Sequence, residues 1–378
     1  MRFRLITACF FCGVLFVLPL RGKAGLVIFG DSLSDSGNTF LATSALTPSP
    51  LPAPIPNPAF GYTAGAFTNG RNWLEPLADR LGEASPVASR VGGSNFAHGG
   101  ASFATSGLLR PSLSEQVNSY LGSVSNPNAL SPSDWHIFWG GANDLLGTPS
   151  ESVAAEVANV IRTQVDNLYQ LGARRFLVLN LPRLGATPLA AATGQDVAAL
   201  DRVSLVFNAD LAQQLQLARV GRADIELFEF DTAAFFAEVS GDPTAFGLSE
   251  VREAATTFDA VGSLFSPQGL ALAAPAGGIN ADAYLFYDGL HPTAAAHSLL
   301  GQRVADAITA IPEPTAALLL VSGLMIWLGR RRRPRAIVPL CILLGCGTLP
   351  LALTSAADPQ AIDLAAFRDG RKHWNDKY

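Results

Sequence analysis

Cysteine and lysine are absent from most of this chain. All four cysteines lie near the two ends, and the lysines are Lys23, Lys372 and Lys377. Residues 25–311 therefore hold neither residue type, which excludes thiol catalysis, zinc–thiolate sites and disulfide bonds from this region. A Schiff-base lysine and the lysine of a phosphate-binding loop are excluded there as well.

Positive charge is also scarce in the same region. Thirteen arginines stand against 26 aspartates and glutamates, which leaves a net charge of −13 with histidine neutral. Such a region repels nucleic acids and anionic membrane surfaces. With 49% hydrophobic residues, the 378-residue chain has ample material for the core of one large or two ordinary domains.

The two ends of the chain resemble export signals. Residues 1–24 have the charged start and apolar middle of a signal peptide, with a retained anchor as the alternative. Residues 312–335 hold a Pro-Glu-Pro motif, an apolar stretch and an arginine cluster. This layout resembles the PEP-CTERM sorting signal of exported proteins from Gram-negative bacteria. At about 15 residues, against about 20 for a bilayer span, the apolar stretch is a marginal transmembrane helix.

These resemblances imply processing and a location. A signal peptidase and an exosortase-type peptidase are the expected processing partners, and the cell surface or the outside of a Gram-negative bacterium is the expected destination. Residues 336–378 repeat the apolar run of a signal peptide and end in a polar segment. We interpret them as an extra tail outside the fold, which leaves residues 25–311 as the folded domain.

Short apolar runs in this domain alternate with helical patterns. The runs predicted as strands are residues 26–29, 135–139, 175–179 and 225–228. The helices between them are predicted to end at Gly82, to begin at a capping box at Ser112 and to have Thr148 as an N-cap. This alternation predicts a parallel sheet covered by helices on both faces, an α/β fold. Residues 240–282 break the pattern and are interpreted as a surface insertion near the site, without firm structure.

Ser32 follows the first predicted strand, where the strand gives way to a helix. That placement exposes its hydroxyl at the carboxyl edge of the sheet. Nearby helix-terminal N–H groups can stabilise a negative charge that develops there. The alternative is that the residues at 31, 32 or 34 only cap the next helix.

Two later turns point to the same edge of the sheet. The paired glycines Gly99 and Gly100 let a backbone N–H face a site without a side chain in the way, or form an ordinary tight turn. Asn143 follows the strand at 135–139 and can offer its amide N–H to the space near Ser32, or simply form a turn. His98 is interpreted as structural.

Asp288 and His291 lie three residues apart in a loop before the last predicted helix. This spacing lets the carboxylate reach one ring nitrogen while the other faces outward. A solvated histidine near a helix cap is the alternative. His297, on the helix itself, is interpreted as a packing or surface residue.

Four segments resemble, in this order, the GDSL or SGNH family of lipases and esterases: 30–33, 99–100, 141–144 and 288–292. The stretches 67–73, 95–101, 180–188 and 287–297 are similar to its plant-type and autotransporter-esterase branch. The resemblance covers about residues 26–308. It implies a three-layer, flavodoxin-like fold with a five-stranded parallel sheet.

The resemblance also implies the role of each site residue. Ser32 is the expected nucleophile, His291 the general base and then acid, and Asp288 the carboxylate that orients the imidazole. The backbone N–H groups of Ser32 and Gly100 and the side chain of Asn143 are the expected oxyanion donors, the second of the paired glycines being preferred over the first. No cofactor and no metal are expected.

The expected function is a secreted serine esterase or lipase that works through an acyl-enzyme. Its substrate is a lipid, a short acyl ester or an acetylated polysaccharide. The alternatives are a polysaccharide O-deacetylase of the extracellular matrix and a non-catalytic surface binding protein on the same fold. The proline-rich loop at 47–58 either walls the substrate groove or serves as a spacer.

Overall fold

The structure is a computed structural model that describes residues 25–49, 51, 53–63, 65–262 and 268–310. The expected signal peptide, sorting signal and extra tail lie outside these residues, so their boundaries stay predictions. Within the described ranges, no helix has the length and the apolar character needed to cross a bilayer.

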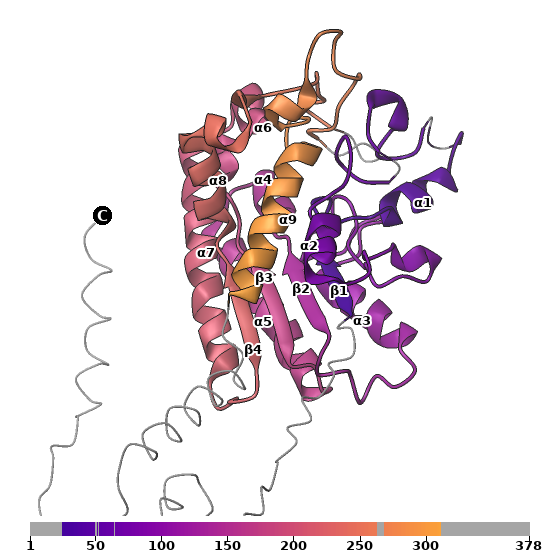
Figure 1. Ribbon diagram of the computed structural model, residues 1–378, viewed down its shortest axis with the longest axis vertical. Coiled ribbons are helices and arrows are strands. Elements are labelled where there is room, and N and C mark those ends of the chain that lie inside the picture. Colours follow the sequence, from indigo (N-terminus) through magenta and orange to yellow (C-terminus); the bar gives the residue numbers. More distant parts are fainter. Residues whose placement is uncertain (1–24, 50, 52, 64, 263–267, 311–378) are drawn as a thin grey trace, which may run out of the picture. The chain divides into compact units, whose positions relative to one another are not determined.

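A four-stranded parallel sheet forms the centre of the domain (Figure 1). Its strands, in their order across the sheet, are β1 (Leu26–Gly30), β2 (Trp135–Trp139), β3 (Arg175–Leu179) and β4 (Glu226–Phe230). Every residue of β1 and β2 is buried. Because helices cover both faces of the sheet, these strands are almost entirely apolar, with the buried His136 of β2 as the exception. All four coincide with predicted runs to within two residues.

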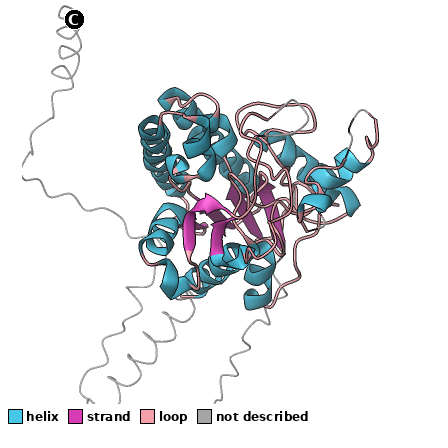
Figure 2. Ribbon diagram, turned by 90° about the horizontal axis from the view of Figure 1, so that it is seen from above, coloured by secondary structure: helices cyan, strands magenta, loops and turns pink. Residues whose placement is uncertain are grey.

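Helices form a layer on each face of this sheet (Figure 2). Val27 and Phe29 of β1 pack in one hydrophobic cluster, and Leu26 and Ile28 pack in the other, because successive side chains of a strand point to opposite faces. The first cluster includes residues of α3 (Leu113–Ser123), α5 (Glu151–Gln170) and α7 (Val197–Arg219). The second includes residues of α2 (Leu74–Leu81), α8 (Thr232–Gly241) and α9 (Ala294–Thr309). The expected three-layer α/β arrangement is therefore present.

Local sequence signals set most of the helix ends. The capping box of Ser112 and Glu115 and the left-handed stop of α2 at Gly82 are confirmed. The predicted cap of α5 at Thr148 is wrong. The side chain of Ser150 accepts the backbone N–H of Val153 in the first turn, so Ser150 is the N-cap and Glu151 begins the helix. The remaining helices are short: α1 (Asn38–Ser44), α4 (Ala142–Leu146) and α6 (Pro188–Thr193).

Among the described residues, the central sheet has four strands instead of the expected five. Residues 94–98 run beside β1, where a fifth strand would pair, but with β1 they form one isolated bridge, between Ile28 and Asn95. The ladder stops because the N–H of Gly30 donates to the side chain of Gln116 at 2.9 Å. The carbonyl of Phe96, which that N–H would otherwise meet, lies 2.9 Å from the Nδ1 atom of a histidine side chain.

The segment 240–282, which was expected to lack firm structure, contains a strand. This strand, β5 (Glu250–Ala254), pairs in parallel with β6 (Tyr284–Phe286). Further along, the N–H of Gly289 donates to the carbonyl of Gly269 at 2.9 Å. The insertion is therefore fixed to the loop that carries the predicted carboxylate and histidine, and it helps to position them.

Candidate active site

Three segments at the carboxyl edge of the sheet carry the predicted site residues. Ser32 follows β1, Asn143 lies in α4 directly after β2, and His291 follows β6. Doubly wound α/β proteins bind ligands outside the carboxyl ends of the strands, where the strand order reverses. In this fold that place lies between β1 and β2, because residues 94–98 run along the other edge of β1.

A continuous chain of hydrogen bonds joins the side chains of Ser32, His291 and Asp288. The hydroxyl oxygen of Ser32 lies 2.7 Å from Nε2 of His291, and Nδ1 lies 2.8 and 3.0 Å from the two carboxylate oxygens of Asp288. The three residues are 8%, 2% and 0% exposed, in that order. The alternative of a solvated histidine is therefore wrong. The structure brings together residues that lie 259 positions apart in the sequence.

The start of α1 is capped without the help of Ser32. The N–H groups of Asn38 and Thr39 donate to the carboxylate of Asp35 at 2.6 and 3.0 Å. The alternative in which the residues at 31, 32 or 34 cap this helix is wrong. The hydroxyl of Ser32 is consequently not needed to cap this helix, and it faces His291 instead.

The carboxylate of Asp288 is held by several donors. Its Oδ1 accepts the N–H groups of Leu290 and His291 at 2.8 and 2.7 Å, and its Oδ2 accepts the hydroxyl of Tyr62. Our sequence analysis did not identify this tyrosine. Tyr62 lies 226 positions from its partner Asp288, and a contact between residues so far apart leaves no local pattern in the sequence.

The paired glycines differ in what their N–H groups do. The N–H of Gly99 donates to Asp35 Oδ2 at 2.9 Å and to the Thr39 hydroxyl at 2.7 Å, so it is already engaged. Gly100 has a φ of 72°, a left-handed backbone that glycine adopts without strain. This difference favours the second glycine, as preferred from the sequence, as the one that can present its N–H to a ligand.

Asn143 is fixed by two contacts at the same edge. Its amide nitrogen donates to the carbonyl of Ala101 at 3.0 Å and lies 3.4 Å from Oδ2 of Asp31. The next residue, Asp144, accepts two N–H groups from the loop at 103–104 at 2.8 and 3.0 Å. These bonds hold the loop after the paired glycines against α4.

Burial controls the protonation of several groups around the site. Burial raises the pKa of Asp31 to about 7, against the opposing effects of the Leu33 N–H and the charge of His291. Burial lowers the pKa of His297 to about 3, and the neighbouring His291 adds to this effect. His297 is 2% exposed, so it is a packing residue. His98 is also buried, which lowers its pKa, and its Nδ1 lies 2.9 Å from a backbone carbonyl.

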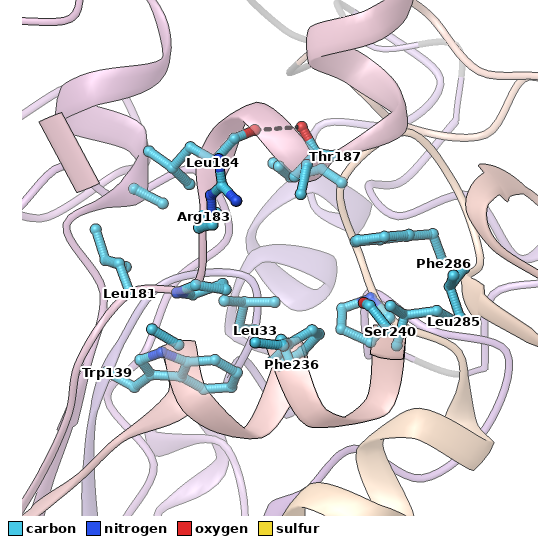
Figure 3. Close-up of a pocket in the computed structure, with 18 of the residues that line it drawn as sticks. Leu33, Trp139, Leu181, Arg183, Leu184, Thr187, Phe236, Ser240, Leu285 and Phe286 are labelled. Atoms are coloured by element: carbon cyan, nitrogen blue, oxygen red, sulfur yellow. Dashed lines mark hydrogen bonds between the residues drawn. The ribbon is translucent and has the colours of Figure 1, made fainter. Parts of the chain in front are cut away.

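A largely apolar cavity of about 330 Å³ opens beside Ser32 (Figure 3). Ser32 and Asn143 belong to its lining, together with residues that follow β3, residues of α8 and residues of β6. Its apolar side chains include Leu33, Trp139, Leu181, Phe236, Leu285 and Phe286. None of the described residues at 47–58 lines it; Ile55 packs instead against the cluster that includes Tyr62. The described residues of the proline-rich loop therefore do not form a wall of this cavity.

Within the described part of the chain, no group of three histidine, cysteine, aspartate or glutamate side chains is arranged to hold a metal ion.

A model of the GDSL-like lipase/acylhydrolase family matches residues 26–304. The chain belongs to this family. The matched region of this GDSL protein includes the predicted residues Ser32, Gly100, Asn143, Asp288 and His291.

Relatives of this GDSL protein come from bacteria and plants. A phosphatidylcholine-sterol acyltransferase of Aeromonas hydrophila is 30% identical over 317 residues, which cover 75% of this chain and 89% of that protein. A GDSL esterase/lipase of Arabidopsis thaliana is 26% identical over 317 residues, 73% of this chain and 85% of that protein. A thermolabile hemolysin of Vibrio parahaemolyticus is 26% identical over 294 residues, 76% of this chain and 64% of that protein. The protein is accordingly an ester hydrolase.

Proposed function

We propose that the protein is a serine esterase or lipase in which Ser32 is the nucleophile, His291 the general base and Asp288 the orienting carboxylate. The observation that carries this proposal is the hydrogen-bonded series Ser32–His291–Asp288, whose serine lines a largely apolar cavity. A nucleophile, a base within hydrogen-bond reach and a third group that orients the base form the arrangement required for covalent acyl transfer.

Hydrolysis then proceeds in two steps. His291 removes the proton of Ser32 as the serine oxygen attacks the ester carbonyl, and the alcohol leaves with that proton. The acyl group remains bound to Ser32. Water attacks the acyl-enzyme with His291 again as the base, which releases the acid and restores the serine hydroxyl. Throughout, Asp288 holds the imidazole in orientation and stabilises its positive charge.

Three N–H donors are proposed to stabilise the oxyanion. They are the backbone N–H groups of Ser32 and Gly100 and the amide of Asn143. The engagement of the Gly99 N–H with Asp35 and the left-handed backbone of Gly100 support this choice. Removal of one such donor typically costs about 3 kcal/mol, or roughly a hundredfold in rate.

The cavity favours an ester with an apolar chain over an acetyl group. About 330 Å³ lined by leucine and phenylalanine side chains exceeds the volume of one methyl group and lies in the size range of ligand pockets. Each buried methylene contributes about 0.8 kcal/mol, or roughly fourfold in kcat/KM. This observation ranks a lipid or acyl esterase above the polysaccharide deacetylase.

One experiment tests both parts of the proposal. Wild type and Ser32→Ala are assayed on p-nitrophenyl esters from acetyl to dodecanoyl, with circular dichroism as the control for folding. We expect turnover to be lost in the folded variant and kcat/KM of the wild type to rise with chain length. Equal turnover in the two proteins would remove Ser32 from the mechanism. A preference for acetyl would favour the deacetylase, and absence of turnover in the wild type would favour the binding protein.

We further propose that the protein is exported and processed at both ends. The layouts of residues 1–24 and 312–335 support a signal peptidase and an exosortase-type peptidase as processing partners, with transient anchoring through the second segment. Mass spectrometry of the protein isolated from its own host should give a chain that starts near residue 25 and ends near residue 312. A native chain that reaches Tyr378 would contradict this.

A further inference from the structure

The hydroxyl of Tyr62 connects the carboxylate of Asp288 to two loops. It donates to Oδ2 of Asp288 and accepts the N–H of Ala271 at 2.7 Å. Tyr62 comes from the segment after the proline-rich loop, and Ala271 comes from the insertion at 240–282. One oxygen atom therefore joins both loops to the residue that orients His291.

The surroundings of Tyr62 leave it little freedom. It is 4% exposed, and its ring meets the ring of Tyr287 edge to face with centroids 5.3 Å apart. Burial, together with the charge of Asp288, raises the pKa of Tyr62 well above its usual range. The hydroxyl therefore stays protonated and acts as a donor to Asp288 at every pH at which an esterase of this kind works.

We propose that Tyr62 is a positioning residue that extends the series Ser32–His291–Asp288 by a fourth member. This inference rests on the proposed function, because it requires His291 to act as the base. Tyr62 fixes Oδ2 of Asp288 in place and spreads part of the carboxylate's negative charge onto its own O–H. It thereby sets how strongly Asp288 attracts a proton on His291.

The position of Asp288 makes this O–H difficult to replace. The carboxylate is 0% exposed, so loss of the hydroxyl leaves Oδ2 with a poorer set of donors in a buried site. A less compensated carboxylate stabilises the imidazolium more strongly, so His291 keeps its proton up to a higher pH. Because the base must be neutral to act, the acidic limb of the rate profile then moves to higher pH.

Other titratable groups also face this series. Among the described residues they are Asp31, Tyr287 and His297. Burial and the charge of Asp288 raise the pKa of Tyr287 to about 12, and His297 stays neutral because it is buried. Asp31 is the one group among these three that titrates near neutral pH. Its contribution is common to all the variants below and cancels in their comparison.

The test compares two substitutions that each remove one hydroxyl. Tyr62→Phe removes the donor to Asp288, and Tyr287→Phe removes a hydroxyl that donates to the carbonyl of Phe60 at 2.6 Å. Both rings belong to the same buried cluster. For Tyr62→Phe we expect kcat/KM to fall about tenfold, mainly through kcat. A tenfold loss is at the lower end of the effect expected when a hydrogen bond to a charged group is removed. The acidic limb of its pH–rate profile should move to higher pH by about half a unit. The control variant Tyr287→Phe should keep the wild-type profile.

A fluorinated tyrosine keeps the test decisive if Tyr62→Phe does not fold. Incorporation of 3-fluorotyrosine at position 62 retains the shape of the ring and makes its hydroxyl a stronger donor. The acidic limb should then move in the opposite direction, to lower pH. A profile that is unchanged in both proteins, or an equal shift in Tyr287→Phe, would overturn the inference and leave Tyr62 as a packing residue.

The Ser32→Ala protein separates this inference from the proposed function. If it keeps full activity, the proposed function fails whatever the tyrosine variants do. If it is inactive while Tyr62→Phe matches the wild type in rate and pH profile, the inference alone fails.

Discussion

The sheet with its covering helices and the loops above it contribute to the site in different ways. The sheet delivers Ser32 and Asn143 to its carboxyl edge through two buried strands that end there. The loops deliver Asp288, and they hold it through side-chain hydrogen bonds such as that of Tyr62. Hydrophobic burial thus places the nucleophile, whereas polar contacts between distant loops place the group that orients the base.

This difference predicts that changes in the loops act on the base and that changes at the sheet edge act on the nucleophile and the oxyanion. Substitutions at the two places should therefore leave different kinetic signatures. The largest effect is expected where a loop residue contacts the imidazole directly.

Asp288→Asn should lower kcat by about 10⁴-fold, because the amide can donate to Nδ1 and stabilise the wrong tautomer of His291. The measurement is kcat on a short acyl ester across pH. The control is Asp282→Asn, which changes an exposed carboxylate that accepts from Asn69 at 3.2 Å. A loss of less than tenfold for Asp288→Asn would mean that the loops do not control the base.

Asn143→Ala should lower kcat about a hundredfold and leave the pH profile unchanged, because an oxyanion donor does not titrate. The exposed Asn159 on α5 provides the control substitution Asn159→Ala. A shifted pH profile would contradict the comparison, since it would mean that the edge of the sheet also acts on the base.

The same difference explains what the sequence predicted and what it did not. Apolar runs identified the four strands, and Ser32 and Asn143 follow two of them directly. The expected fifth strand does not form among the described residues, because the side chain of Gln116 takes the N–H that would have continued the ladder. Tyr62 and the order within the 240–282 insertion were missed because their contacts join residues far apart in sequence, and no periodicity records such contacts.

Asp31 lies at the boundary between the two regions and gives a test through stability. Its pKa is raised from 3.8 to about 7, so the folded protein binds a proton that the unfolded chain has lost between these values. This contribution to stability is complete below pH 4 and is lost as the pH rises to about 7. At 1.4 kcal/mol per pH unit, the loss has an upper limit of about 4 kcal/mol.

Asp31→Asn removes that pH dependence. Relative to the wild type, the variant should gain about 2 kcal/mol of unfolding free energy between pH 4 and pH 8, below the limit because local relaxation offsets part of the cost. Urea unfolding at the two pH values measures this gain. The exposed Asp79 serves as the control through Asp79→Asn. If the wild type and Asp31→Asn respond identically to pH, the buried carboxyl is not protonated near neutrality.

The smallest effect is expected in the cavity, where the sheet and the loops share one substrate surface. Ala233 of α8 belongs to the lining, whereas its neighbour Ala234 is exposed and does not. Ala233→Leu should therefore shorten the preferred acyl chain by about two methylenes and lower kcat/KM for long esters about tenfold, at roughly fourfold per methylene. Ala234→Leu adds the same volume outside the cavity and should change neither. Because His291 is not among the residues that line the cavity, the pH profile should stay that of the wild type, which separates acyl-chain selection from control of the base. An equal loss on acetyl and long-chain esters would show that α8 acts on the chemistry rather than on the length of the chain.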